Sequence, residues 1–457
     1  MLGKAKNIHF VGIGGIGMSG IAEVLINLGF IVSGSDLEKS DITEHLSSLG
    51  ARICEGHSAG NIADAEVVVV SSAINSTNPE VVAANESGIP VIPRSDMLGE
   101  LMRMRSGIAI AGAHGKTTTT SLAAVVLEEA GLDPTVVVGG KVKSLKTNAR
   151  LGEGEYIVAE VDESDGNFVR LSPDIALITN IDAEHLDFYG SLENIFDAFV
   201  RFARQVTFNG AVICCLDDPN VRNILPRIDR RIITYGFSVE ADITGRITEY
   251  SGEGTEFTVI AGDEEKGRFF LRLPGRHNVL NALGVCALAG ELGIGFDDVR
   301  KAFNDFKGVG RRFEFKGKSS GVTVIDDYAH HPTEIKAAVE TARKSFNSRV
   351  VVVFQPHRYT RTRDLHKRFS ECFHDADELF ITEIYAAGER PIPGITGELV
   401  YRSALRGGAK KVTYIPDWEG LRESVYSCLE EGDVLLTLGA GNIFKMGEEY
   451  LERESND

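Results

Sequence analysis

The sequence predicts an α/β protein with three domains: an N-terminal Rossmann-like domain, a central domain of the phosphate-loop ATPase type and a C-terminal Rossmann-like domain. The chain has 457 residues, and a typical domain takes about 150. Short apolar runs alternate with helical patterns in every third of the chain, as in parallel sheets covered by helices. Several of these runs end in a glycine-rich turn. We expect the domains to span residues 1–100, 101–308 and 309–457.

The N-terminal third begins with a strand, a turn and a helix typical of nucleotide-diphosphate sites. An apolar run at residues 8–11 leads into a G-x-G-x-x-G turn, and Asp36 follows the last glycine of that turn by 19 residues. This pattern places a diphosphate at a helix N-terminus and an acid near a ribose. A nucleotide diphosphate is the favoured ligand; NAD and a purely structural turn are the alternatives. The expected contacts are Gly12, Gly14, Gly15, Ile16, Gly17 and Asp36.

A second ligand-binding edge follows a run of four valines at residues 67–70. A run of this kind is typical of a buried strand, and ligands of open α/β sheets bind at the carboxyl ends of strands. We therefore expect Ser71 and Ser72 to lie near the same nucleotide.

Residues 107–121 are the most informative stretch of the chain. An apolar strand enters a glycine turn, and a Lys-Thr pair then opens a helix. Such a loop wraps a polyphosphate with backbone amides, a lysine charge and a hydroxyl for Mg²⁺. Ile110 stands where the strict phosphate-loop pattern has glycine, so this loop is a variant, and a chance glycine turn is the alternative. The expected nucleotide contacts are Gly112, Ala113, His114, Gly115, Lys116, Thr117 and Thr118.

Two further strands deliver polar groups near this loop. The run at residues 156–160 ends in Glu160, and the run at residues 175–179 leads to His185. Together with Thr117, these residues could converge on divalent cations that clamp phosphate oxygens. A surface histidine is the alternative for His185, and the acids at residues 162–165 are expected to form a solvated turn.

A turn at residues 273–278 feeds another helix and is a candidate adenine site. His277, Asn278 and Asn281 would lie on the first turns of that helix. Taken alone, the pattern is better explained by Asn278 capping the helix N-terminus.

The C-terminal third carries a basic cluster after a strand at residues 350–354. His357 precedes three arginines, of which Arg358 and Arg361 lie closest to it. Arginines in this density suit a phosphate or a carboxylate, and a solvated basic loop is the alternative. Another apolar run, at residues 322–325, delivers Asp327, His330 and His331.

Composition narrows the classes of partner. The net charge of −18 disfavours binding to nucleic acid or to an anionic membrane surface. The six cysteines show no C-x-x-C spacing, which suits a reducing compartment and no structural zinc. We see no signal peptide and no run of about 20 apolar residues. We therefore expect a cytoplasmic protein. For the oligomeric state, which composition does not determine, we expect a monomer or a weak homodimer.

Several of these motifs, in this order, resemble the Mur ligases of peptidoglycan synthesis. The likeness extends over essentially the whole chain, and segments at residues 357–361 and 385–389 look like the alanine-adding branch. The segments that carry it are residues 10–20, 112–119, Glu160, the strand before His185, residues 275–278, residues 327–332 and residues 357–361.

The resemblance implies that the protein ligates L-alanine to the lactyl carboxylate of UDP-N-acetylmuramate, through an acyl phosphate, with ATP and two Mg²⁺ ions. ADP and phosphate would be released. Thr117, Glu160 and His185 would hold the metal. His277, Asn278, Asn281, Arg312 and Asp327 would complete the ATP site. The catalytic groups would be Lys116, Glu160, His185, His330 (or His331), Arg358 and Arg361.

The chain departs from the family in two places. Ala113 stands where related ligases often have threonine. No lysine occurs between Lys146 and Lys266, so the carbamylated lysine of later ligases cannot form there. Three other functions remain alternatives: an NAD-dependent oxidoreductase, a nucleotide-regulated binding protein without chemistry, and the recycling ligase that joins a tripeptide to the same sugar nucleotide.

Overall fold

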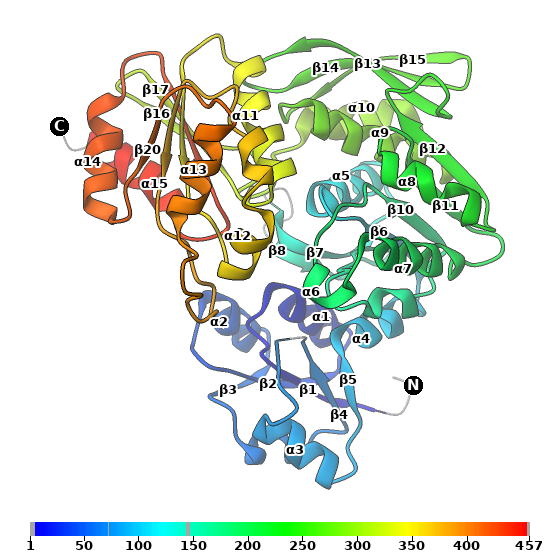
Figure 1. Cartoon of the computed structure of the whole chain (residues 1–457). Coiled ribbons are helices and arrows are strands. Elements are labelled where there is room, and N and C mark those ends of the chain that lie inside the picture. Colours follow the sequence, from blue (N-terminus) through cyan, green and yellow to red (C-terminus); the bar gives the residue numbers. More distant parts are fainter. Residues whose placement is uncertain (1–4, 72, 143–146, 455–457) are drawn as a thin grey trace. The chain divides into compact units, whose positions relative to one another are not determined.

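The computed structural model describes residues 5–71, 73–142 and 147–454, and three sheets organise this part of the chain (Figure 1). The predicted three-domain α/β fold is confirmed, because each sheet is rich in parallel strands joined by helices. Contacts divide the chain into two compact units. The first unit comprises Met1–Arg246, Thr258–Gly267 and Leu280–Lys307, and the second comprises Ile247–Phe257, Arg268–Val279 and Gly308–Asp457.

The N-terminal sheet has the strand order β3-β2-β1-β4-β5, and all its neighbouring strands are parallel. This is the order expected for a Rossmann-like half. The strands are β1 (Asn7–Val11), β2 (Ile31–Asp36), β3 (Arg52–Glu55), β4 (Val67–Val70) and β5 (Val91–Pro93), and the helices are α1 (Ile16–Asn27), α2 (Asp41–Ser48), α3 (Pro79–Glu86) and α4 (Arg94–Met102).

Alternation along β1 explains how both faces of this sheet are covered. Ile8 and Phe10 belong to the core cluster that contains α1, whereas Val11 packs in a smaller cluster with Ala84 of α3. Since neighbouring side chains of a strand point to opposite faces, His9 is directed to the α3 face. It is fully buried there.

The α3 face also buries a carboxylate, Glu80. Its Oε2 accepts a hydrogen bond from Ser35 Oγ at 2.6 Å and lies 3.7 Å from His9 Nε2. Its Oε1 accepts a hydrogen bond from Asn61 Nδ2 at 2.5 Å. Burial would raise the pKa of Glu80, but the imidazole of His9 and the bonds from Ser35 and Asn61 lower it to about 2. The charge is therefore stabilised by the hydrogen bonds from Ser35 and Asn61 and by the nearby imidazole.

Replacing this carboxylate should destabilise the N-terminal sheet in a pH-dependent way. The folded-state pKa lies below the unfolded value of 4.5, so the stabilisation is complete above pH 4.5 and is lost as the pH falls toward 2. We expect Glu80→Gln to lower the free energy of unfolding by about 2–3 kcal/mol at pH 7. Denaturant unfolding at several pH values measures the difference. Glu86→Gln, an exposed position on the same helix, is the matched control.

The central sheet has ten strands in the order β15-β14-β13-β12-β11-β10-β6-β9-β7-β8. Strand β6 lies between β9 and β10 and is parallel to both, so the carboxyl ends of all three meet at one edge. The strands are β6 (Ser106–Ala111), β7 (Thr135–Val142), β8 (Thr147–Arg150), β9 (Tyr156–Glu160), β10 (Ile175–Ile178), β11 (Ala211–Cys215), β12 (Ile232–Gly236), β13 (Ile243–Tyr250), β14 (Thr255–Ala261) and β15 (Glu264–Leu271). The helices are α5 (Lys116–Glu129), α6 (Leu186–Tyr189), α7 (Leu192–Arg204), α8 (Pro219–Ile224), α9 (Arg276–Glu291) and α10 (Phe296–Asp305).

The C-terminal sheet has the order β16-β17-β21-β18-β19-β20, with only β16 antiparallel to its neighbour. One face packs on α11 and α13, and the other packs on α14 and α15. The elements are β16 (Glu314–Ser319), β17 (Val322–Asp327), α11 (Pro332–Ser345), β18 (Val350–Phe354), α12 (Tyr359–Leu365), β19 (Glu378–Ile381), α13 (Gly397–Arg406), β20 (Val412–Tyr414), α14 (Trp418–Cys428), β21 (Val434–Leu438) and α15 (Phe444–Glu454). Within the described residues, no helix combines the length and apolar character needed to span a bilayer.

Candidate active site

The phosphate loop lies between β6 and α5, at the carboxyl edge of the central sheet. Two of its glycines have left-handed backbone conformations, with φ of 138° at Gly112 and 81° at Gly115. A Cβ at Gly112 would collide with the hydroxyl of Thr179, and one at Gly115 would lie 2.6 Å from Asn281 Oδ1. Both positions therefore require glycine. The structure also brings Asn281 of α9 against this loop.

The end of β10 holds the loop in place through His114. The amide of His114 donates to Asn180 Oδ1 at 2.7 Å. Its carbonyl accepts from Asn180 Nδ2 at 2.8 Å and from Thr179 Oγ1 at 2.6 Å. The imidazole Nε2 lies 3.1 Å from Asp182 Oδ2. These bonds fix the loop before any ligand arrives, which reduces the cost of ordering it on binding.

Lys116 opens α5 and is paired with a carboxylate that the sequence did not single out. Its ammonium donates to the carbonyl of Gly112 at 2.5 Å and lies 2.8 Å from Glu163 Oε2. The prediction that the acids at residues 162–165 form a solvated turn is wrong for Glu163, which is only 4% exposed. Because the Glu163 side chain is buried, its negative charge is stabilised by the positive charge of Lys116 beside it.

Burial and charge act in opposite directions on this pair. Burial would lower the pKa of Lys116, but the carboxylates of Glu163, Asp162 and Glu160 outweigh it and raise that pKa above its usual value. Burial raises the pKa of Glu163 to about 7, against the lowering effect of Lys116. The lysine thus stays charged, which a phosphate ligand requires.

Thr117 and Glu160 form a contact that suits a hard cation. The Thr117 hydroxyl donates to Glu160 Oε1 at 3.0 Å, and Glu160 Oε2 accepts from the amide of Gly139 at 2.6 Å. A hydroxyl and a carboxylate beside a polyphosphate loop are the oxygen ligands that Mg²⁺ prefers. The donor set therefore fits this ion.

His185 lies at a second cluster of candidate ligands. Its backbone is left-handed, with a φ of 55°. Its Nε2 is 3.9 Å from Glu163 Oε1 and 3.8 Å from Glu184 Oε2. The ligand atoms of these three residues lie within 4.8 Å of one another, close enough for one ion. Of the three predicted metal ligands, the structure joins Thr117 to Glu160 and places His185 with Glu163 and Glu184.

The N-terminal glycine loop contacts the predicted ribose acid. The amide of Gly14 donates to Asp36 Oδ2 at 2.8 Å. Gly12 has a φ of 78°, and a Cβ there would lie 4.0 Å from Ser71 Oγ. Gly15 precedes the first residue of α1, Ile16, and the amides of this turn are therefore at a helix N-terminus. Ser72 lies outside the described residues.

Arg94 is a residue of this region that sequence reasoning missed. A Cβ at Gly17 would collide with its guanidinium, so the arginine lies directly on the glycine loop. Its Nη2 also donates to Asp162 Oδ2 at 2.8 Å. Burial would raise the pKa of Asp162, but the charges of Arg94 and Lys116 lower it to about 2. The sequence feature that could have identified Arg94 is its position directly after Pro93, the last residue of the edge strand β5.

The C-terminal unit groups the predicted His330 and Arg361 around His357. The rings of His330 and His357 lie 5.7 Å apart, and Arg361 Nη1 is 3.2 Å from His357 Nδ1. His357 also stacks on Tyr385 at an interplanar angle of 7°. Burial and the charges of His330 and Arg361 lower the pKa of His357 to about 3, so it is neutral and can accept from the arginine.

The three other predicted residues of this unit, Arg358, Asp327 and Arg312, each have a different local environment. Arg358 has a φ of 68° and precedes α12. Both carboxylate oxygens of Asp327 accept from backbone amides at 2.7 Å, and burial raises its pKa to about 7. Arg312 lies 3.9 Å from Glu334 and over the ring of Tyr328.

The structure gives local roles to His331 and Asn278. His331 Nδ1 accepts from the amide of Thr333 and caps α11, whereas the ring of His330 lies 5.7 Å from that of His357. The capping prediction for Asn278 is wrong, because α9 already begins at Arg276. The Asn278 amide group instead donates to the carbonyl of Pro274 at 2.6 Å. His277 lies between Arg276 and Asn278 in the first turn of α9.

Comparisons with known proteins find relatives of this chain. Three family models match consecutive parts of the chain: the Mur ligase family catalytic domain over residues 7–106, the Mur ligase middle domain over residues 110–289, and the Mur ligase glutamate ligase domain over residues 311–441. A UDP-N-acetylmuramate–L-alanine ligase of Geotalea daltonii is 52% identical over 99% of each chain. The corresponding ligase of Geobacter sp. (strain M21) is 54% identical over 99% of this chain and 98% of its own.

The chain belongs to the Mur ligase family. The crystal structure of a UDP-N-acetylmuramate–alanine ligase from Thermotoga maritima matches this Mur ligase with a TM-score of 0.82, at 33% identity over 98% of this chain and 99% of its own. A murein peptide ligase from Psychrobacter arcticus shares the fold, with a TM-score of 0.69 and 23% identity over 99% of both chains.

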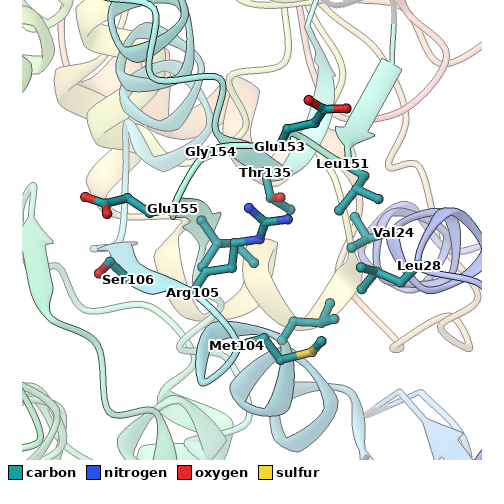
Figure 2. Close-up of a pocket in the computed structure, with 12 residues that line it drawn as sticks. Val24, Leu28, Met104, Arg105, Ser106, Thr135, Leu151, Glu153, Gly154 and Glu155 are labelled. Carbon is teal, nitrogen blue, oxygen red and sulfur yellow. The ribbon is translucent and has the colours of Figure 1, made fainter.

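Figure 2 shows a cavity of this Mur ligase, and none of the residues that line it belongs to the phosphate loop. It has a volume of about 420 Å³ and is lined by Ser106 and Thr135, the first residues of β6 and β7, and by Ile157 near the start of β9. Figure 2 shows the side chain of Arg105 among them. Because ligands of such sheets bind at the carboxyl ends of strands, this cavity is not the site of the phosphate chemistry.

Proposed function

We propose that this Mur ligase joins L-alanine to the lactyl carboxylate of UDP-N-acetylmuramate and converts ATP to ADP and phosphate. The observation that carries the proposal is the 52% identity, over 99% of both chains, to a ligase named for that reaction. The phosphate loop supports it, because Lys116, Thr117 and Glu160 supply the charge and the oxygen ligands that phosphoryl transfer needs.

In the first step, the lactyl carboxylate attacks the γ-phosphorus of ATP, and the bond to the β-phosphate oxygen breaks. Lys116 would bind the terminal phosphates, since its ammonium already lies among the carbonyls of the loop. Two bound Mg²⁺ ions would neutralise charge on the phosphates, one held by Thr117 and Glu160 and the other by His185 with Glu163 and Glu184. The products of this step are an acyl phosphate and ADP.

In the second step, the amine of L-alanine attacks the acyl carbon, and phosphate leaves from the tetrahedral intermediate. Arg361 and Arg358 would bind the carboxylate of the amino acid or stabilise the developing charge, with His330 beside them. The stack of His357 on Tyr385 keeps Arg361 in one orientation. Asp327 and Arg312 would complete the ATP site together with His277, Asn278 and Asn281.

The sugar nucleotide would bind at the N-terminal glycine loop. The turn amides from Gly12 to Gly17 would face the diphosphate, with Asp36 and Ser71 near the uridine. We add Arg94 to this site, because its guanidinium covers Gly17 and brings a positive charge to the diphosphate.

The same proposal covers organisation and partners. We propose domains at residues 1–100 for the UDP-sugar, 101–308 for ATP and 309–457 for the amino acid, and a monomer or weak homodimer. Closure of the domains on the substrates would exclude water from the acyl phosphate. Neither nucleic acid nor a membrane is a proposed partner, and the proposed compartment is the cytoplasm.

Crowding the glycine loop should weaken binding of the sugar nucleotide. A Cβ at Gly14 would lie 2.8 Å from Asp36 Oδ2, and a valine adds two more carbons there. We expect Gly14→Val to weaken UDP-N-acetylmuramate binding by about tenfold or more, which is a loss of about 1.4 kcal/mol. Calorimetric titration measures this. Gly60→Val, where a Cβ meets nothing within 4 Å, is the control, and unchanged affinity in Gly14→Val would move the ligand elsewhere.

The reaction itself is tested by phosphate release from ATP and Mg²⁺, with UDP-N-acetylmuramate and L-alanine, glycine, L-serine or the tripeptide added in turn. Release that requires the sugar nucleotide and is fastest with L-alanine supports the proposal. A second candidate is tripeptide ligation, since a Neisseria meningitidis ligase named for a tripeptide substrate is 29% identical over 67% of this chain and 100% of its own, with a TM-score of 0.62. Release only with the tripeptide would favour it.

A further inference from the structure

A hairpin of the central sheet touches the sugar-nucleotide loop. Strands β7 and β8 are antiparallel, and β8 carries Asn148. The Asn148 Nδ2 donates to the carbonyl of Ile16 at 2.8 Å and lies 3.3 Å from Ser19 Oγ. Ser19 Oγ donates to the same carbonyl at 3.0 Å. A side chain of the hairpin thus binds the first turn of α1, whose N-terminal amides are proposed to bind the diphosphate.

Close packing accompanies this hydrogen bond. A Cβ at Gly20 of α1 would lie 3.3 Å from the Cβ of Ala149 and 3.4 Å from Asn148 Nδ2. The absence of a side chain at Gly20 is what allows β8 to approach the helix so closely. Ala149 is fully buried, so this contact excludes water. The position of α1 against the hairpin is therefore fixed by packing as well as by the hydrogen bond from Asn148.

The other strand of the hairpin touches the metal-binding carboxylate. The amide of Gly139 in β7 donates to Glu160 Oε2 at 2.6 Å. A Cβ at Gly139 would lie within 2.7 Å of that carboxylate, so this approach also depends on glycine. Glu160 in turn accepts from Thr117. One hairpin thus contacts the phosphate-loop carboxylate through β7 and the glycine loop through β8.

We propose that Asn148 is a positioning residue for the sugar-nucleotide site and that the β7–β8 hairpin couples this site to the ATP site. The proposal rests on the proposed function. Nucleotide with Mg²⁺ engages Glu160 and thereby changes its bond to Gly139, and the hairpin carries that change to Asn148 and the carbonyl of Ile16. Coupling of this kind is reciprocal, so the sugar nucleotide changes the affinity for ATP by the same factor.

The test compares the affinity for UDP-N-acetylmuramate with and without a non-hydrolysable ATP analogue and Mg²⁺. For the wild-type protein we expect the analogue to change the dissociation constant by about fivefold or more. Asn148→Asp keeps the shape of the side chain but removes the donor. We expect it to weaken sugar-nucleotide binding by about three- to tenfold without the analogue and to bring the coupling factor near one. Affinity for the analogue alone should not change, because Asn148 does not touch the phosphate loop.

Two further variants separate positioning from damage to the fold. Asn148→His places a ring N–H close to the position of the original donor and should restore most of the coupling. Asn27→Ala changes an exposed residue at the other end of α1 and should behave as the wild type. Undiminished coupling in Asn148→Asp, or a wild-type coupling factor of one, would overturn the inference. A wild-type protein that binds no UDP-N-acetylmuramate would instead overturn the proposed function, and this inference with it.

Discussion

Lys116→Met is expected to lower kcat by about 10³-fold or more, while the affinity for UDP-N-acetylmuramate stays nearly unchanged. The ammonium lies on the phosphate loop, 2.5 Å from the Gly112 carbonyl and 3.1 Å from that of Ala113. A neutral thioether there leaves the charge that develops on the transferring phosphate without its main cationic partner. Hydroxylamine trapping of the acyl phosphate measures the first step directly, and calorimetry measures sugar-nucleotide binding.

Loss of this lysine also leaves the buried Glu163 without its partner. The double variant Lys116→Met/Glu163→Gln removes the charge from both residues, so it should regain thermal stability without regaining activity. Lys301→Ala, which breaks an exposed pair with Glu129, is the matched lysine control and should keep full activity. Acyl-phosphate formation by a folded Lys116→Met protein at the wild-type rate would contradict the proposed role, and an equal loss of sugar-nucleotide binding would contradict the division between sites.

Elements with a strong local signal could be predicted from the sequence. The strands β4 and β18 begin and end at the residues predicted for them, because each is a short run of apolar residues between turn residues. The two glycine loops were predictable for the same reason, since a strand, a glycine turn and a helix are contiguous in the chain. The predicted sheet edges also follow, because parallel strands place their carboxyl ends together.

Contacts between distant segments could not be predicted in this way. Glu163 is 47 positions from Lys116, and its burial depends on the packing of the loop that contains it. Arg94 and Asp162 are 68 positions apart, and neither has a local pattern that identifies the other as its partner.

The contacts of Arg311 in the C-terminal domain also could not be predicted from the sequence. Its guanidinium donates to Asp326 Oδ2 at 3.0 Å and to the carbonyls of Gly439 and Gly441, and no local pattern around Arg311 identifies these partners. It also lies over the rings of Tyr328 and Phe444, 5.0 and 4.6 Å from their centroids. One side chain thereby joins the end of β17 to the loop after β21, and this arrangement exists only once the sheet has formed.

The second large effect is expected at Glu160. Glu160→Gln keeps the size of the side chain and one carbonyl oxygen but removes the charge that suits Mg²⁺. We expect kcat to fall by about 10²-fold and the Mg²⁺ concentration for half-maximal activity to rise by about tenfold. The Gly139 amide will also lose an acceptor if the new amide nitrogen faces it, since that bond is 2.6 Å long in the wild type. Phosphate release measured over a range of Mg²⁺ concentrations separates the two parameters.

Glu155→Gln is the control for this variant, because Glu155 is an exposed acid just before the same strand, β9, but at its amino end. It should leave the Mg²⁺ dependence unchanged. If Glu160 only held the hairpin through Gly139, Glu160→Gln would alter sugar-nucleotide coupling but not the Mg²⁺ requirement. If it only bound the metal, saturating Mg²⁺ would restore wild-type coupling. We expect Glu160→Gln to change both the Mg²⁺ requirement and the sugar-nucleotide coupling, since one carboxylate oxygen accepts from Thr117 and the other from the hairpin.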